Sequence, residues 1–116
     1  MDNPLKWKSK EFAIKIIRLY QNLTNDKKEF VMSRQILKSG TSIGANIKEA
    51  NEAQSKADFI SKMSIALKEA SETEYWLELL NETDYMDKMD FQNIYGLNKE
   101  LIKMLTSIIK KSKENT

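Results

Sequence analysis

The side chains able to do chemistry in this sequence are lysine, arginine and carboxylates, because its 116 residues include no His and no Cys. Without His the chain lacks the usual general base near neutral pH, the commonest metal ligand, and the partner of a nucleophilic Ser or Cys. Nucleases that pair an Arg with a nearby His are excluded for the same reason. We therefore predict that the protein is not an enzyme and has no catalytic, cofactor-binding or metal-binding residues.

Carboxylates are concentrated between residues 55 and 86, which carry three basic and seven acidic side chains, a net charge of 3 − 7 = −4. Glu74, Glu78 and Glu82 are four residues apart and share one face of a predicted helix. Carboxylates can bind Mg²⁺ or Ca²⁺, but these ions need a shaped set of oxygen ligands. A solvated face, or pairing with Lys99 and Lys103, is the interpretation we favour.

Basic side chains are concentrated in residues 1–28, where seven basic and three acidic groups give 7 − 3 = +4. One interpretation is charge matching between neighbouring helices. The other is a basic surface that binds phosphates, and its candidate nucleic-acid contacts are Lys6, Lys8, Lys10, Lys15 and Arg18. Trp7 could stack on a base there or anchor the helix by packing. The sequence pI of 8.7 is below the value of about 9 typical of nucleic-acid binders.

The elements that must position these groups are helices, because one Pro and three Gly leave long stretches uninterrupted. Apolar residues recur every three or four positions, as at Phe12, Ile16, Leu19 and Leu23 or at Phe59, Met63, Ala66 and Ala70. A third such series is Ile94, Leu97, Leu101, Met104 and Ile108. We predict one all-α domain over 1–116, an antiparallel up-down-up-down four-helix bundle. Its helices are predicted at about 8–23, 29–53, 56–82 and 88–112.

Gly40 and Gly44 lie four residues apart in the second predicted helix, where each costs roughly 1 kcal/mol relative to Ala. Close approach of another helix would offset that cost; a kink or partly unwound turn near Gly40 is the alternative. The third predicted helix is apolar on more than one side, which favours self-association, although Tyr75 and Trp76 could instead cap the bundle end. The candidate close-packing or oligomer-interface residues are Ser39, Gly40, Ile43, Gly44, Ile47, Tyr75 and Trp76.

The segment from Arg34 to Leu80 carries a resemblance to a known family. Its pattern is matched by Gln35, Ile36, Ser39, Ser42, Ile43, Asn46, Ile47, Glu49 and Ala50, and continues with Ser55, Asp58, Phe59, Leu67, Glu69 and Glu72. On these residues the chain resembles the bacterial four-helix-bundle proteins encoded within 23S rRNA intervening sequences. Gly44 stands where that family often has Pro, and Ala50 where it often has Gly.

The resemblance implies an antiparallel bundle that assembles as a ring-like homopentamer. The family is similar to the accessory proteins of diversity-generating retroelements, pentamers that partner a reverse transcriptase and nucleic acid. The resemblance implies no catalytic or cofactor residues.

Together these features predict a non-enzymatic homo-oligomeric scaffold, pentameric by the resemblance, that binds RNA or DNA backbone weakly. The alternative is a protein–protein adaptor that holds a partner protein and binds no nucleic acid. We expect no membrane association and a cytoplasmic location, because the first residues lack the apolar run of a signal peptide and no apolar stretch approaches 18 residues.

Overall fold

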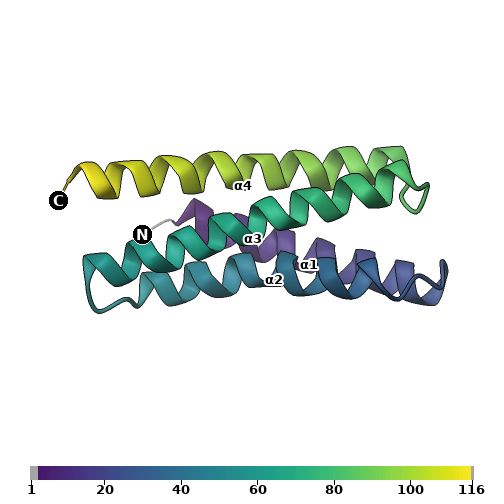
Figure 1. Ribbon diagram of the computed structural model, residues 1–116, viewed down its shortest axis with the longest axis horizontal. Helices are drawn as coiled ribbons and strands as arrows, with labels where there is room; N and C mark the ends of the chain where they lie inside the picture. The colour runs from purple at the N-terminus through teal and green to yellow at the C-terminus, as the bar shows by residue number, and fades with distance from the viewer. Residues whose placement is uncertain (1–2, 116) are drawn as a thin grey trace.

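Four helices account for most of residues 3–115, the part of the chain that the computed structural model describes (Figure 1). They are α1 (Pro4–Asn25), α2 (Met32–Asn51), α3 (Lys56–Glu82) and α4 (Lys88–Glu114). Short loops join them, so each helix runs back along its predecessor, and the molecule is 48 Å long and 20–24 Å across. The predicted all-α four-helix bundle is confirmed.

Three helices begin where a short polar side chain accepts a hydrogen bond from the first turn. The Asn3 side chain accepts one from the Lys6 N–H (3.1 Å), and α1 therefore starts at Pro4, before the predicted position 8. Ser55 caps α3 (3.0 Å), and Asp87 caps α4 through the Met89 N–H (2.8 Å). Those two helices start where the sequence predicted.

Helix α2 starts three residues later than predicted because Glu29 caps it from outside the helix. The buried Glu29 carboxylate accepts hydrogen bonds from the backbone N–H groups of Val31 (3.2 Å), Met32 (3.0 Å) and Ser33 (2.8 Å). Burial alone would raise the pKa of Glu29, but these hydrogen bonds outweigh it and hold the pKa below its usual value. The preceding Lys28 has the left-handed φ of 55° that turns the chain.

The core runs the length of the bundle, and its helices pack in the cyclic order α1, α2, α3, α4. Within the described residues, α1 does not pack against α3, nor α2 against α4, and α1 and α4 form the least extensive of the four contacts. Phe12, Ile16, Leu19 and Leu23 are buried as predicted. In α4, Ile94 and Leu101 are buried as predicted, but the other three core positions were predicted one residue early. The buried residues there are Asn98, Leu105 and Ile109.

Gly40 packs tightly against a side chain of α1. A Cβ atom built on Gly40 would lie 2.8 and 2.9 Å from the two γ carbons of the fully buried Ile16. At Gly44 the nearest atoms belong to Ser9 and would be 3.5 Å away, an ordinary van der Waals distance. Helix α2 continues through both glycines, without the unwound turn that was the alternative. Packing therefore requires a glycine at position 40 and leaves room for a methyl group at 44.

Two polar contacts cross the core. The Thr73 hydroxyl lies 2.9 Å from the Ser39 hydroxyl, which joins α3 to α2. The fully buried Asn98 donates through Nδ2 to the Ala70 carbonyl (2.9 Å), which joins α4 to α3, while its Oδ1 has no hydrogen-bond partner among the described residues. Such contacts favour one relative position of the helices over alternatives.

Candidate interaction surfaces

The five candidate nucleic-acid contacts lie on different sides of α1. Lys8 faces α4 and forms an ion pair with Glu100 at 2.8 Å. The hydrogen bond that Lys8 donates to this carboxylate raises the pKa of Lys8. Lys6 lies over the Trp7 ring, 5.3 Å from its centroid. The remaining three, Lys10, Lys15 and Arg18, form no ion pair with any described residue. Of the five cations, Lys8 is thus the one that forms an ion pair within the described chain.

The side of α1 that faces away from the bundle combines exposed apolar and basic side chains. We define the α1 outer face as Trp7, Lys10, Ile14, Ile17 and Arg18. Trp7, Ile14 and Ile17 are 56%, 47% and 40% exposed. A hollow of about 490 Å³ on this side is lined by residues of α1 alone: Trp7, Lys10, Glu11, Ile14, Lys15 and Arg18.

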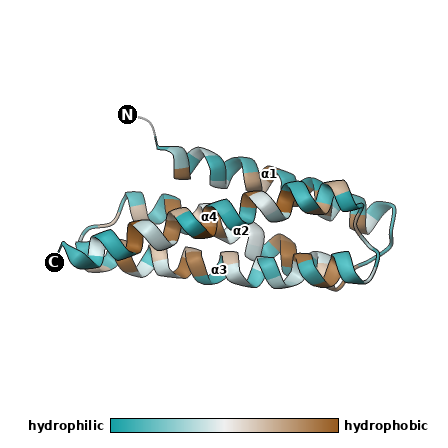
Figure 2. Ribbon diagram, turned by 90° about the horizontal axis from the view of Figure 1, so that it is seen from above, coloured by the Kyte–Doolittle hydropathy of each residue, from teal (hydrophilic) through white to brown (hydrophobic). Residues whose placement is uncertain are grey.

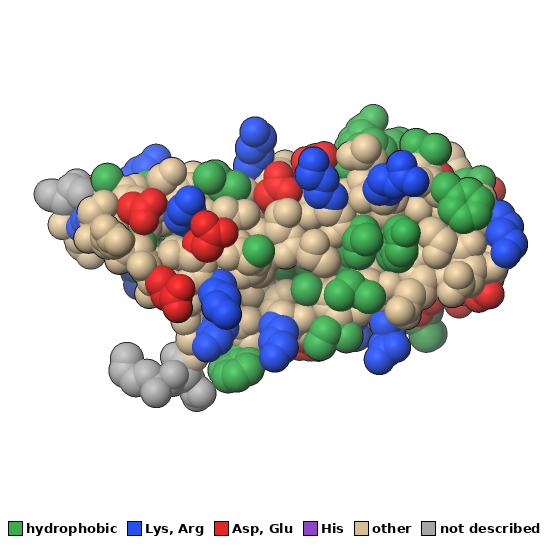
Figure 3. All heavy atoms as spheres, turned by 90° about the horizontal axis from the view of Figure 1, so that it is seen from below, with side chains coloured by type: hydrophobic (Ala, Val, Ile, Leu, Met, Phe, Trp, Pro, Cys, Tyr) green, Lys and Arg blue, Asp and Glu red, His purple; other side chains and the backbone are tan. Residues whose placement is uncertain are grey.

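A second basic feature is the groove between α1 and α2, on the side of the molecule seen in Figure 3. Its volume is about 360 Å³, and we call it the lysine groove because Lys6, Lys10 and Lys48 line it. Its other lining residues are Ser9, Ala13, Thr41, Gly44 and Ala45, so no described acidic side chain borders it. Small residues keep the floor of the groove accessible between the lysines.

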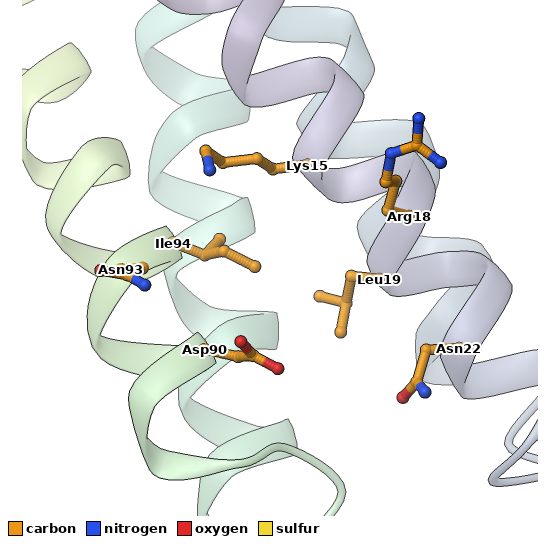
Figure 4. Close-up of a pocket in the computed structure, with 7 residues that line it drawn as sticks. All are labelled: Lys15, Arg18, Leu19, Asn22, Asp90, Asn93 and Ile94. Atoms are coloured by element: carbon orange, nitrogen blue, oxygen red, sulfur yellow. The ribbon is translucent and has the colours of Figure 1, made fainter.

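The groove between α1 and α4 has mixed charge. In Figure 4, Lys15 and Leu19 of α1 extend toward Asp90 and Ile94 of α4 across a hollow of about 270 Å³, while Arg18 turns away from α4. Because a cation and a carboxylate face each other across this hollow, it lacks the single sign of charge that favours phosphate binding.

The outward side of α3 is apolar and acidic. We define the α3 outer face as Ile65, Lys68, Glu72, Tyr75 and Glu82, all of them exposed. Tyr75 and Ile65 are 55% and 40% exposed. Two of the helix's other acids are used within the bundle: Glu74 pairs with Lys99 at 2.8 Å, and Glu78 accepts a hydrogen bond from the Tyr95 hydroxyl at 2.7 Å. The sequence predicted either a solvated acidic face or acids paired with lysines of another helix. The structure has both: Glu74 pairs with Lys99, and other acids of α3 are exposed.

The residues expected at a close-packing or oligomer interface divide between the interior and the surface. Ser39, Gly40, Ile43 and Ile47 are buried within the single chain, where α2 packs on its neighbours. They contribute to packing between helices of one chain and are not accessible to a second copy. Gly44 and Trp76 are half-buried, and Tyr75 is exposed beside Trp76, with ring centroids 5.3 Å apart.

Sequence reasoning missed Ile14 and Lys48 as surface residues. Ile14 could have been found from helical geometry, since it lies seven residues after Trp7 and two positions from the buried series. Lys48 joins the α1 lysines only through the packing of two helices, which one helix's periodicity does not reveal. Within residues 3–115, no group of three acidic side chains is arranged to hold a metal ion, and no helix is long and apolar enough to cross a membrane.

The fold is a four-helix bundle with charged and apolar outer faces, and comparison with known proteins gives its family. The sequence model of the 23S rRNA-intervening sequence proteins matches residues 2–107. The chain belongs to this family, as the resemblance of its second and third helices indicated. A comparison with curated proteins finds no match.

A solved structure supports the same assignment. A protein of unknown function from Bacteroides thetaiotaomicron, described as belonging to the S23 ribosomal protein family, is 60% identical in sequence to this chain. The match covers 91% of this chain and 98% of that one, with a TM-score of 0.90. The two proteins therefore share their fold over nearly the whole length.

Proposed function

We propose that this protein is a non-enzymatic scaffold that acts as a homo-oligomer, a pentamer by the family resemblance. The observation that carries the proposal is the exposure of large apolar side chains on two separate helices: Trp7, Ile14 and Ile17 on α1, and Ile65 and Tyr75 on α3. Large exposed apolar patches on a protein surface mark sites where it meets a partner.

Native mass spectrometry of the full chain at micromolar concentration tests the assembly. The expected result is one dominant oligomer, with five copies as the specific expectation. A monomer at that concentration contradicts the scaffold proposal, and another closed number contradicts only the pentamer.

A second function, weak binding of RNA or DNA backbone, is favoured by the lysine groove. Three lysines line it without a described acid nearby, and each phosphate contact by a lysine releases condensed counterions. Repetition of the groove around an oligomer would multiply the phosphate contacts that one copy offers.

Anisotropy of a labelled single-stranded oligonucleotide tests this second function. We expect log affinity to fall linearly with log salt, and the substitutions Lys6→Glu, Lys10→Glu and Lys48→Glu to abolish binding. The matched control makes the same charge change on α4, at Lys88, Lys103 and Lys110, and retains at least part of the affinity. Unchanged oligonucleotide affinity after charge reversal of the groove lysines contradicts the lysine groove as the binding site. Binding of a partner protein through a contact that is insensitive to salt supports the adaptor alternative.

A further inference from the structure

The two outer faces have properties that suit them to each other. Each carries exposed apolar side chains within one stretch of helix, with an aromatic residue in each: Trp7 on α1 and Tyr75 on α3. At a rise of 1.5 Å per residue, Trp7 to Arg18 spans about 17 Å and Ile65 to Glu82 about 26 Å. The α3 stretch is thus long enough to cover the α1 stretch.

The charges on the two outer faces are of opposite sign. The α1 outer face has two cations, Lys10 and Arg18, whereas the α3 outer face has two carboxylates, Glu72 and Glu82, and one cation, Lys68. None of these five forms an ion pair with another described residue. Glu72 accepts a hydrogen bond from Trp76 Nε1 at 3.3 Å, and all five side chains are exposed, so each can still form an ion pair with a second copy.

The two faces lie on opposite sides of the molecule. Helices α1 and α3 occupy diagonal positions, since they do not pack against each other within the described chain. Figure 2 shows α1 along one edge of the bundle and α3 along the opposite edge. One chain therefore cannot bring its own two faces together, and each face is available only to another molecule.

We propose, resting on the homo-oligomeric scaffold above, that copies assemble head to tail, the α1 outer face of one against the α3 outer face of the next. A symmetric contact between two α1 outer faces would place Lys10 and Arg18 opposite the same cations, and like charges across an interface are unfavourable. A head-to-tail contact uses one face of each kind per copy, so it repeats until the rotation between copies closes a ring.

Native mass spectrometry of four chains tests this pairing: the wild type, Lys10→Glu/Arg18→Glu, Glu72→Lys/Glu82→Lys, and the chain with all four substitutions. All substituted residues are exposed, and circular dichroism checks that each chain keeps its helices. We expect both double variants to be monomeric under conditions in which the wild type is assembled. The fourfold chain is expected to assemble again, because its two faces are complementary with reversed signs.

The outcomes separate this pairing from the scaffold itself. A monomeric wild type overturns the scaffold and the pairing together. An assembled wild type whose double variants also stay assembled overturns only the assignment of these faces, and so does a fourfold chain that stays monomeric. If the α1 reversal leaves the mass unchanged, the pairing is wrong; loss of oligonucleotide binding in the same variant then shows that Lys10, which also lines the lysine groove, or Arg18 contacts nucleic acid.

Discussion

At the scale of single residues, the two glycines of α2 and the one of α4 have different reasons to be glycine. Gly40 has Ile16 against it, Gly44 has only an ordinary contact with Ser9, and a Cβ at Gly96 would meet nothing within 4 Å. A sequence shows all three as the same break in helix propensity. Only the neighbouring helix determines which one could gain a methyl group.

Gly40→Ala is expected to destabilise the fold, and Gly96→Ala to stabilise it. The methyl group at position 40 must displace the buried Ile16, and overpacking of this kind costs about 1–3 kcal/mol, more than the gain in helix propensity. At position 96 only the gain of about 1 kcal/mol remains. Urea denaturation of both variants measures the difference. If Gly40→Ala is as stable as Gly96→Ala, close packing of α1 on α2 is not what requires glycine at position 40.

Asn98 gives a second prediction at this scale, because its buried Oδ1 lacks a partner in the described chain. Asn98→Leu removes the unsatisfied oxygen and keeps the number and branching of side-chain heavy atoms, so we expect a gain of about 1–2 kcal/mol in the free energy of unfolding. Asn98→Ala removes the same oxygen but leaves a cavity, and is expected to cost stability. A loss of stability in Asn98→Leu would mean that the bond to the Ala70 carbonyl outweighs the unpaired oxygen.

At the scale of helices, the sequence predicts the number of helices and the starts of α3 and α4 better than it predicts the starts of α1 and α2 or which side of α4 faces the core. The spacing of Phe12 to Leu23 identifies the buried side of α1, and Ser55 and Asp87 mark the starts of α3 and α4. Three positions of the α4 series are missed because core position 98 is polar and because Met104 and Ile108 are apolar like the buried Leu105 and Ile109 beside them. The start of α2 is missed because the capping group, Glu29, lies outside the helix.

Glu29 makes the stability of α2 depend on pH. Its pKa is lowered in the folded state from the ordinary 4.5, so the unfolded state binds more protons in the range between the two values. The stabilisation is therefore complete above pH 4.5 and is lost as the pH falls through the folded pKa. Glu29→Gln is expected to cost about 1–2 kcal/mol near neutral pH, and less in acid. Thermal denaturation from pH 7 to pH 3 measures this, with the exposed Glu52→Gln as control; a cost that does not change with pH would contradict the charged cap.

At the scale of the whole molecule, the number of copies and the pairing of faces depend on surfaces that one helix's periodicity does not describe. The sequence showed an excess of apolar residues, but it left open whether Ser39, Gly40, Ile43 and Ile47 pack within one chain or at an interface, and one chain buries them by itself. Among the large apolar side chains left exposed are those of α1 and α3, on opposite edges of the bundle. The fold and the family can be predicted from the sequence. The interface can be located only when it is known which apolar side chains the fold has already buried.

If copies cover these faces for each other, thermal stability must rise with protein concentration. Binding that occurs only in the folded state stabilises it by mass action, by about 2.7 kcal/mol at one hundred times the dissociation constant. At about 4–8 °C per kcal/mol for a domain of this size, the melting temperature should rise by about 10–20 °C across that range. Differential scanning fluorimetry over a dilution series measures the shift. The Lys10→Glu/Arg18→Glu variant should melt at one temperature throughout, and a wild type that does the same is a folded monomer that needs no second copy.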